Sequence, residues 1–145
     1  TYNEYWQIID AGLDADELVN FKYEDQGVAT LEDGLYVLEK NLADAAFVDK
    51  MARFVRASMK GWEWARANPD AAADIVLEND ETGAQTEEHQ RRMMAEVNKL
   101  TMNGGKLSTA DYQRTVETLM NGGSDPVISS MPKGAWTHKV WDAAF

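Results

Sequence analysis

One stretch of sequence decides the predicted fold, Phe54-Val-Arg-Ala-Ser-Met-Lys-Gly-Trp-Glu-Trp-Ala-Arg-Ala-Asn-Pro-Asp-Ala-Ala-Ala-Asp-Ile-Val76. With the residues before it, this stretch predicts a long helix from an N-cap at Asp44 to about Ala67. Its apolar positions recur at steps of three or four and predict one buried stripe: Phe47, Met51, Phe54, Val55, Ser58, Trp62 and Ala65. Asn68-Pro69 ends this helix and begins a short one, because proline fits the first turn of a helix but not its interior. The residues of the short helix expected to face inward are Ala72, Ile75 and Val76.

Three more helices are predicted downstream. The first runs from Thr86 to Leu100, and its apolar side consists of Met93, Met94, Val97 and Leu100. Ser108-Thr-Ala-Asp111 is a capping-box pattern that starts the second, whose core positions are Tyr112, Val116, Leu119 and Met120. Each of these two helices ends at an Asn-Gly-Gly sequence, at 103–105 and 121–123. A terminal helix is expected within 136–144, packing through Trp136, Val140 and Trp141.

The region upstream of the long helix has a different pattern. A short helix is expected from Tyr2 to Ala11, ended by Gly12. The run Glu17-Leu-Val-Asn-Phe-Lys-Tyr23 alternates and Gly34-Leu-Tyr-Val-Leu38 is apolar, so both are predicted to be strands. Gly27 between them marks a turn. Two short strands do not form a stable sheet alone, and we expect them to complete a larger sheet whose other strands lie upstream of Thr1.

Composition excludes several classes of protein. The chain has 145 residues, 44% of them hydrophobic, and a formal net charge of −11. This acidity disfavours nucleic-acid binding, since phosphate recognition relies on clustered Lys and Arg. The lack of cysteine excludes disulfides, zinc–thiolate sites and cysteine nucleophiles. No apolar run approaches the roughly 20 residues that span a bilayer, and no secretory signal is visible. Because the chain opens at Thr1, we expect a mature or truncated product.

The sequence contains no pattern of catalytic chemistry. His89 lies in a predicted helix among charged neighbours and is expected to be solvated, while His138 is expected to have a structural or capping role. No metal-ligand spacing, nucleophile elbow, phosphate-binding loop or dinucleotide fingerprint is present. An acidic helix face is predicted to be solvated, and it consists of Asp70, Asp74 and Glu78. The sequence therefore predicts no catalytic residue, metal or cofactor.

The cluster Tyr2-Asn-Glu-Tyr-Trp6 allows two interpretations. Its aromatic faces, amide and carboxylate suit stacking on a flat heterocycle and accepting hydrogen bonds from the amino groups of that ring. The alternative is an ordinary helix N-terminus, in which Asn3 is the cap, the helix dipole favours Glu4 and the aromatic rings pack in the core. Spacing by itself favours the second interpretation and leaves the first open.

Two stretches resemble one known family. Phe54–Val76 is similar in order and spacing to a recurrent segment of the ABC-importer solute-binding proteins for thiamine-pyrimidine precursors, taurine, alkanesulfonates, nitrate and riboflavin. In that family a long helix, an Asn-Pro break and a short helix follow one another. Tyr2-Asn-Glu-Tyr-Trp6, followed by Gly27-Val-Ala-Thr-Leu-Glu-Asp-Gly-Leu-Tyr-Val37, also resembles this family. The resemblance covers most of the chain and is weakest beyond about Thr101.

The resemblance implies an α/β fold. The chain would be the carboxy-terminal portion of a type II periplasmic-binding-protein fold, mainly helical with two or three short strands. Residues from 1 to about 25 would form the end of lobe two and the hinge, and residues from about 26 to 145 the carboxy-terminal part of lobe one. Closure of the lobes over a solute would let the protein dock on a membrane permease.

The resemblance also implies a function and a site. The chain would be the solute-binding component of an ABC importer, periplasmic or lipid-anchored outside the cytoplasm, capturing a thiamine-pyrimidine-like solute, a sulfonate or a similar molecule. It would not be an enzyme. The ligand-binding residues would be Tyr2, Asn3, Glu4, Trp6, Glu32 and Asp33. Glu4 would accept hydrogen bonds from the solute, Asn3 would orient it, and Tyr2 or Trp6 would stack on it.

Two alternatives remain at this point. The first is an enzyme on the same scaffold, akin to pyrimidine-phosphate synthases. The second is a free-standing helical interaction module, against which the orphan strands argue because their unpaired edges would be exposed. For the same reason, the chain studied alone is expected to dimerise or to have low stability.

Overall fold

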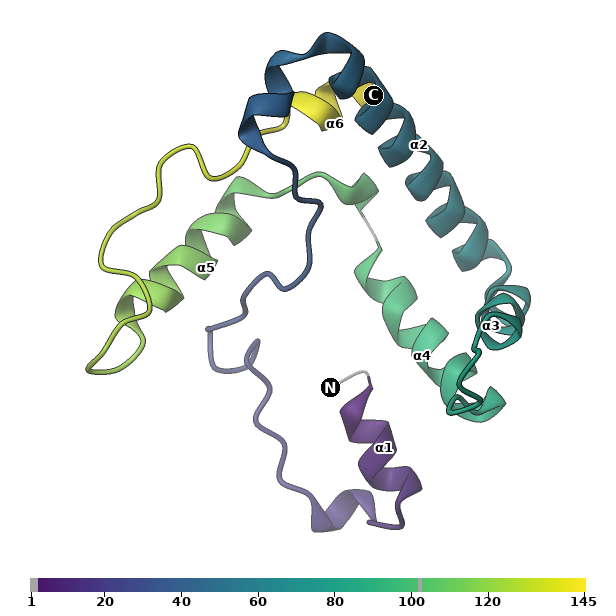
Figure 1. Cartoon of the computed structure of the whole chain (residues 1–145). Helices are drawn as coiled ribbons and strands as arrows, with labels where there is room; N and C mark the ends of the chain where they lie inside the picture. Colours follow the sequence, from purple (N-terminus) through teal and green to yellow (C-terminus); the bar gives the residue numbers. More distant parts are fainter. Residues whose placement is uncertain (1–2, 102) are drawn as a thin grey trace. The chain divides into compact units, whose positions relative to one another are not determined.

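The computed structural model describes residues 3–101 and 103–145 (Figure 1). Helices make up 59% of these residues, and no strand occurs among them. The chain divides into two compact units, which we describe separately. The first unit comprises Thr1–Asn20 and Ala57–Gly105, and the second comprises Phe21–Arg56 and Lys106–Phe145.

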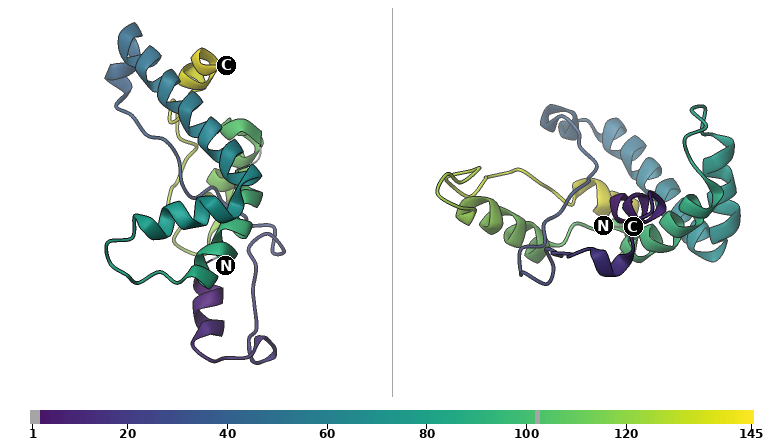
Figure 2. Two further views of the ribbon diagram at one scale, coloured as in Figure 1. Left: turned by 90° about the vertical axis from the view of Figure 1, so that its right-hand side faces the viewer. Right: turned by 90° about the horizontal axis from the view of Figure 1, so that it is seen from below.

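The α/β prediction is wrong. Of the first predicted strand, only Glu17 lies in a regular element, the 3-10 helix η1 (Ala15–Glu17), and its remaining residues are non-helical, as are residues 34–38 (Figure 2). Large apolar side chains of both predicted strands are exposed, Val19 by 81%, Phe21 by 75% and Tyr36 by 81%. A strand needs a neighbour to satisfy its backbone N–H and C=O groups. The described part of the chain provides no such neighbour, so alternation did not produce a sheet.

The first unit contains five elements and the end of a sixth: α1 (Glu4–Asp10), η1, α3 (Pro69–Glu78), α4 (Glu87–Leu100), η3 (Asn103–Gly105) and the carboxy-terminal part of α2 (Ala45–Ala67). The predicted start of α2 is confirmed, because the Asp44 carboxylate accepts a hydrogen bond from the Ala46 N–H at 2.9 Å. The Asn68-Pro69 break is also confirmed. However, the Asn68 side chain donates to the Trp64 carbonyl at 2.9 Å instead of capping α3.

Helices α3 and α4 pack against each other through small side chains (Figure 1). Ala73 is fully buried and Ala72 is 6% exposed. The prediction that Ile75 and Val76 face inward is wrong, since they are 48% and 42% exposed. Alanine allows two helix backbones to approach closely, which explains why the alanine face of α3 is the buried one.

The buried stripe of α2 differs from the predicted one. Its most buried side chains are Val48, Ala52 and Ala65, whereas Phe54 is 55% exposed. Of the predicted stripe only Ala65 belongs to this group. Apart from Phe54, the other predicted positions are partly buried, so the packed face overlaps the predicted stripe and extends to Val48 and Ala52.

The second unit contains η2 (Glu39–Ala43), α5 (Thr109–Asn121), α6 (Lys139–Ala144) and the first part of α2. Helix α6 lies beside this part of α2 (Figures 1 and 2), because Arg56 donates to the carbonyls of Ala143 and Ala144 at 3.2 and 2.9 Å. Ser108 is the N-cap of α5 as predicted, since its hydroxyl accepts from the Asp111 N–H. Helix α6 begins at Lys139, later than Trp136.

Candidate functional site

The first predicted site residue in the described part of the chain is Asn3, at the start of α1. Its backbone carbonyl accepts from the N–H groups of Trp6 and Gln7 at 3.1 and 3.2 Å. Its side chain does not cap the helix, because Asn3 Oδ1 instead lies 2.8 Å from His89 Nε2 on α4. Asn3 therefore occupies the N-cap position of α1, as the ordinary interpretation expected, but its side chain does not cap the helix. Tyr2, another predicted ligand residue, lies outside the described residues.

Arg92 holds α1 to α4. Its Nη1 donates to both carboxylate oxygens of Asp10 at 2.9 and 3.1 Å, and its Nη2 donates to Glu88. The hydrogen bond that Arg92 donates to Asp10 is the main reason that the pKa of Arg92 is raised above its ordinary value. The guanidinium also lies over the ring of Trp6, 4.7 Å from the ring centre, a cation–π arrangement. One face of Trp6 is thus already covered by a cation.

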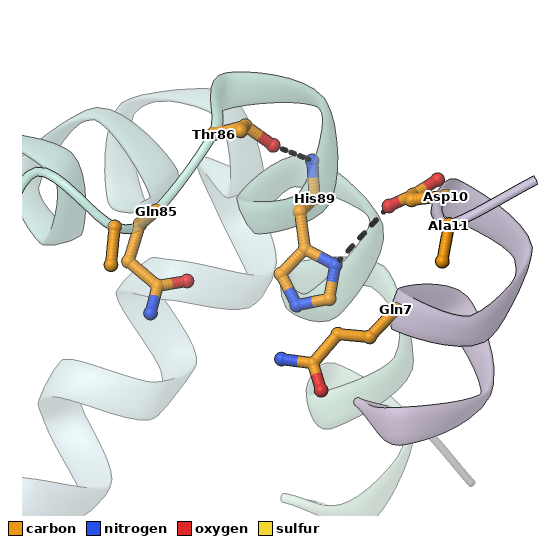
Figure 3. Close-up of a pocket in the computed structure, with 7 residues that line it drawn as sticks. Gln7, Asp10, Ala11, Gln85, Thr86 and His89 are labelled. Atoms are coloured by element: carbon orange, nitrogen blue, oxygen red, sulfur yellow. Dashed lines mark hydrogen bonds and ion pairs between the residues drawn. The ribbon is translucent and has the colours of Figure 1, made fainter.

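Beside these contacts lies a pocket of about 390 Å³ in the first unit (Figure 3). Helix α1, the loop before α4 and the first turn of α4 supply its lining: Gln7, Asp10, Ala11, Ala84, Gln85, Thr86 and His89. Figure 3 shows the imidazole of His89 between Gln85 on one side and Gln7 and Asp10 on the other.

Two polar residues shape the loop on this side of the pocket. The Asp80 carboxylate accepts from the Thr82 and Gln85 N–H groups, each at 2.9 Å, and from the Thr82 hydroxyl. These bonds, that of the Thr82 side chain first, lower the pKa of Asp80. The Thr86 hydroxyl accepts from the His89 N–H and caps α4. Together they position the loop that carries Gln85 to the pocket.

His89 is the residue that the sequence interpretation missed. It was expected to be solvated, but it is only 6% exposed. Because Asn3 Oδ1 accepts hydrogen bonds only, His89 Nε2 carries the proton in the neutral ring, and Nδ1 is an acceptor. Nδ1 is buried without a hydrogen-bond partner, and the closest carboxylate oxygen, Asp10 Oδ2, is 3.8 Å away. Met93, four residues later on the predicted apolar face, was the sequence signal that His89 faces inward.

The predicted site residues do not gather at one place in the described structure. Asn3 and Trp6 contact α4 in the first unit, and the exposed Glu4 belongs to the same unit. Glu32 and Asp33 belong to the second unit, where both are exposed on non-helical chain. The role of these residues in binding stays a prediction.

The surroundings of the pocket are acidic. Arg91 on α4 bonds to two carboxylates of α3 at 3.0 Å each and to one of α4 at 2.8 Å. The hydrogen bond that Arg91 donates to Glu87 contributes most to the raised pKa of Arg91. Two guanidinium groups on α4 therefore face five carboxylates, which are Asp10, Asp70, Asp74, Glu87 and Glu88.

Neither a metal centre nor a membrane span is found in the part of the chain that the structure describes. No three or more His, Cys, Asp or Glu side chains gather there in a way that suits a metal ion. Among the same residues, none of the helices combines the length and the apolar character that crossing a bilayer requires.

Comparison with known proteins gives one match. Residues 1–72 match the family model described as NMT1/THI5 like. No curated protein and no solved structure matches the chain. The matched family consists mostly of solute-binding proteins, of the type that handles thiamine precursors, nitrate and taurine, and it includes a synthase-like member. The matched residues contain the whole of α1 and α2, so this part of the chain is similar to the NMT1/THI5-like family.

Proposed function

We propose that this chain is part of an extracytoplasmic solute-binding protein that captures a small organic solute and delivers it to an ABC permease. The observation that carries the proposal is the family match over residues 1–72, because the family suggests a solute-binding role in ABC transport. The division at about residue 25, between the end of one lobe with its hinge and the other lobe, belongs to the same proposal. Capture requires no chemistry, only a solute that binds one conformation better than another.

Contacts at the start of α1 support a solute that donates hydrogen bonds. Asn3 is fixed by His89, which holds the amino-terminal end of α1 in place. Glu4, in the first turn of α1, has an exposed carboxylate that accepts hydrogen bonds only. Trp6 is packed under Arg92 on one face, so we assign it a stacking role through the other. In the same proposal Tyr2, Glu32 and Asp33 complete the ligand contacts.

The charge of the first unit favours one class of candidate solute over another. The carboxylates of the first unit outnumber the arginines that they contact on α4, and like charges placed close together repel. A solute with amino groups, such as a thiamine-pyrimidine-like molecule, fits this environment better than a sulfonate does. We therefore place the sulfonates second.

Calorimetry of the whole chain against both kinds of solute tests the proposal. An aminopyrimidine is expected to bind in roughly the micromolar range or tighter, and a sulfonate more weakly. Glu4→Ala is expected to weaken binding about tenfold or more, because a hydrogen bond to a charged group is lost. Glu63→Ala, which removes an exposed carboxylate on α2, is the matched control. Unchanged affinity in Glu4→Ala contradicts the assigned site, and failure of every solute contradicts the function.

A further inference from the structure

We propose that the pocket lined by Asp10 and His89 is a subsite for a primary ammonium group. The nitrogen of this group is held between the Asp10 carboxylate and His89 Nδ1. The inference rests on the proposed function, since it names the class of solute that the first unit accepts. Among the described residues that the family resemblance implied, none lines this pocket.

The first argument is the unsatisfied acceptor. The side chain of His89 is more than nine-tenths buried, and its Nδ1 has no hydrogen-bond partner. Buried acceptors are almost always paired, because an unpaired one has lost its water without replacement. Figure 3 shows this nitrogen directed to the side of the pocket where Asp10 lies. A ligand that brings an N–H group into the pocket supplies the missing donor.

The second argument is the spacing of the two acceptors. Nδ1 and Asp10 Oδ2 are 3.8 Å apart, too far for a direct hydrogen bond. Two acceptors at this separation can both lie about 2.9 Å from a single nitrogen placed beside the line that joins them. An ammonium group has three N–H donors, so it satisfies both acceptors and keeps one donor for a third group.

The third argument is charge. Both carboxylate oxygens of Asp10 already accept hydrogen bonds from Arg92. However, Arg92 also forms an ion pair with Glu88, and Arg91 forms ion pairs with three further carboxylates. The local excess of negative charge favours a cation over a neutral donor. The same excess disfavours an anion at the start of α4, where Glu87 and Glu88 occupy the end at which the helix dipole would attract one.

The test uses the whole chain and three small probes that differ in charge and in N–H donors. Propylammonium carries charge and N–H donors, trimethylpropylammonium carries charge without donors, and propanol carries neither charge nor an ammonium group. Long-range proton–nitrogen NMR of the imidazoles is recorded at about pH 8, above the range in which histidines commonly titrate. The chain has two histidines, and His138, whose Nε2 donates to the Leu107 carbonyl, is the internal control.

Propylammonium is expected to shift the Nδ1 resonance of His89 saturably, to leave His138 unchanged, and to bind at least about tenfold more tightly than the other two probes. An equal response to trimethylpropylammonium overturns the role of the N–H donors. A His89 ring with its proton on Nδ1 in the free chain also overturns the proposal, because that nitrogen then cannot accept.

A pair of variants gives an independent measurement. Asp10→Asn is expected to weaken propylammonium binding about tenfold, whereas Asp70→Asn, which removes a carboxylate from the Arg91 cluster outside the pocket lining, is expected to change it less than about twofold. Equal losses in both variants overturn the subsite in favour of general attraction by negative charge. If Asp10→Asn does not fold, the probe series on the unaltered chain decides.

The design separates this inference from the function on which it rests. If solutes bind in calorimetry but propylammonium leaves His89 unmoved, the subsite is wrong and the proposed function stands. If propylammonium binds at His89 but no larger solute binds, the subsite stands and solute capture is wrong.

Discussion

The packed pair α3–α4 and the segment 21–38 both have strong apolar patterns in the sequence, but only one of them became regular structure. Helices α3 and α4 formed close to their predicted boundaries, with Ala73 fully buried between neighbours. Segment 21–38 formed no helix or strand, and Phe21, Leu35 and Tyr36 are 75%, 54% and 81% exposed.

The two regions differ in where the partners of their backbone hydrogen bonds come from. A helix makes them within itself, so a local pattern, a cap and a stop are sufficient to define it. An extended segment needs a second segment, and its own pattern does not provide one. The turn at Gly27, where the Val28 N–H donates to the Tyr23 carbonyl at 3.0 Å, formed as predicted because it too is local.

The largest expected effect comes from placing a larger side chain in the contact between α3 and α4. Ala73→Leu is expected to lower the free energy of unfolding by about 2 kcal/mol, because the larger side chain has no space between the helices. Urea denaturation followed by circular dichroism measures it. Ala71→Leu, at an exposed position on the same helix, is the control and is expected to change stability by less than about 0.5 kcal/mol.

The same measurement on segment 21–38 shows whether the comparison holds. Phe21→Ser replaces a large but exposed side chain, so the change is expected to stay within about 0.5 kcal/mol. A loss as large as that of Ala73→Leu would mean that the segment is packed, and the contrast between the two regions would disappear.

A smaller effect is expected at the cap of α4. Thr86→Ala removes the hydroxyl that accepts from the His89 N–H and is expected to cost about 1 kcal/mol. Thr86→Ser keeps the acceptor and is expected to retain most of that stability. If alanine and serine behave alike in urea denaturation, the cap does not stabilise α4.

The smallest expected effect is a loss of stability in acid, which arises in the loop between α3 and α4. The bonds to Asp80, that of the Thr82 side chain first, hold its pKa below the ordinary value of 3.8. A lowered folded-state pKa stabilises the fold above the ordinary value, and this stabilisation is lost as the pH falls through the folded-state pKa. The urea midpoint is therefore expected to fall on acidification below about pH 4, and less so in Asp80→Asn. An identical pH profile in the variant would contradict this role of Asp80.

Local signals predicted much of the fold. Asp44, Thr86 and Ser108 mark helix starts that the structure confirms, and Asn68-Pro69 marks the break between α2 and α3. The candidate site was harder to predict from the sequence. Asn3 and Trp6 were singled out for their polar and aromatic character, but their partners His89 and Arg92 come from a helix far along the chain. Nothing in residues 2–6 indicates those partners.

The sequence alone determined the helices and the turns, because capping, helical period and glycine conformation act over a few residues. The tertiary structure decided which face of α3 packs, left segment 21–38 without a strand, and buried His89 with an unpaired nitrogen beside Asp10. Those outcomes depend on contacts between residues distant in the chain, and the free energy of such contacts belongs to pairs of segments rather than to either one.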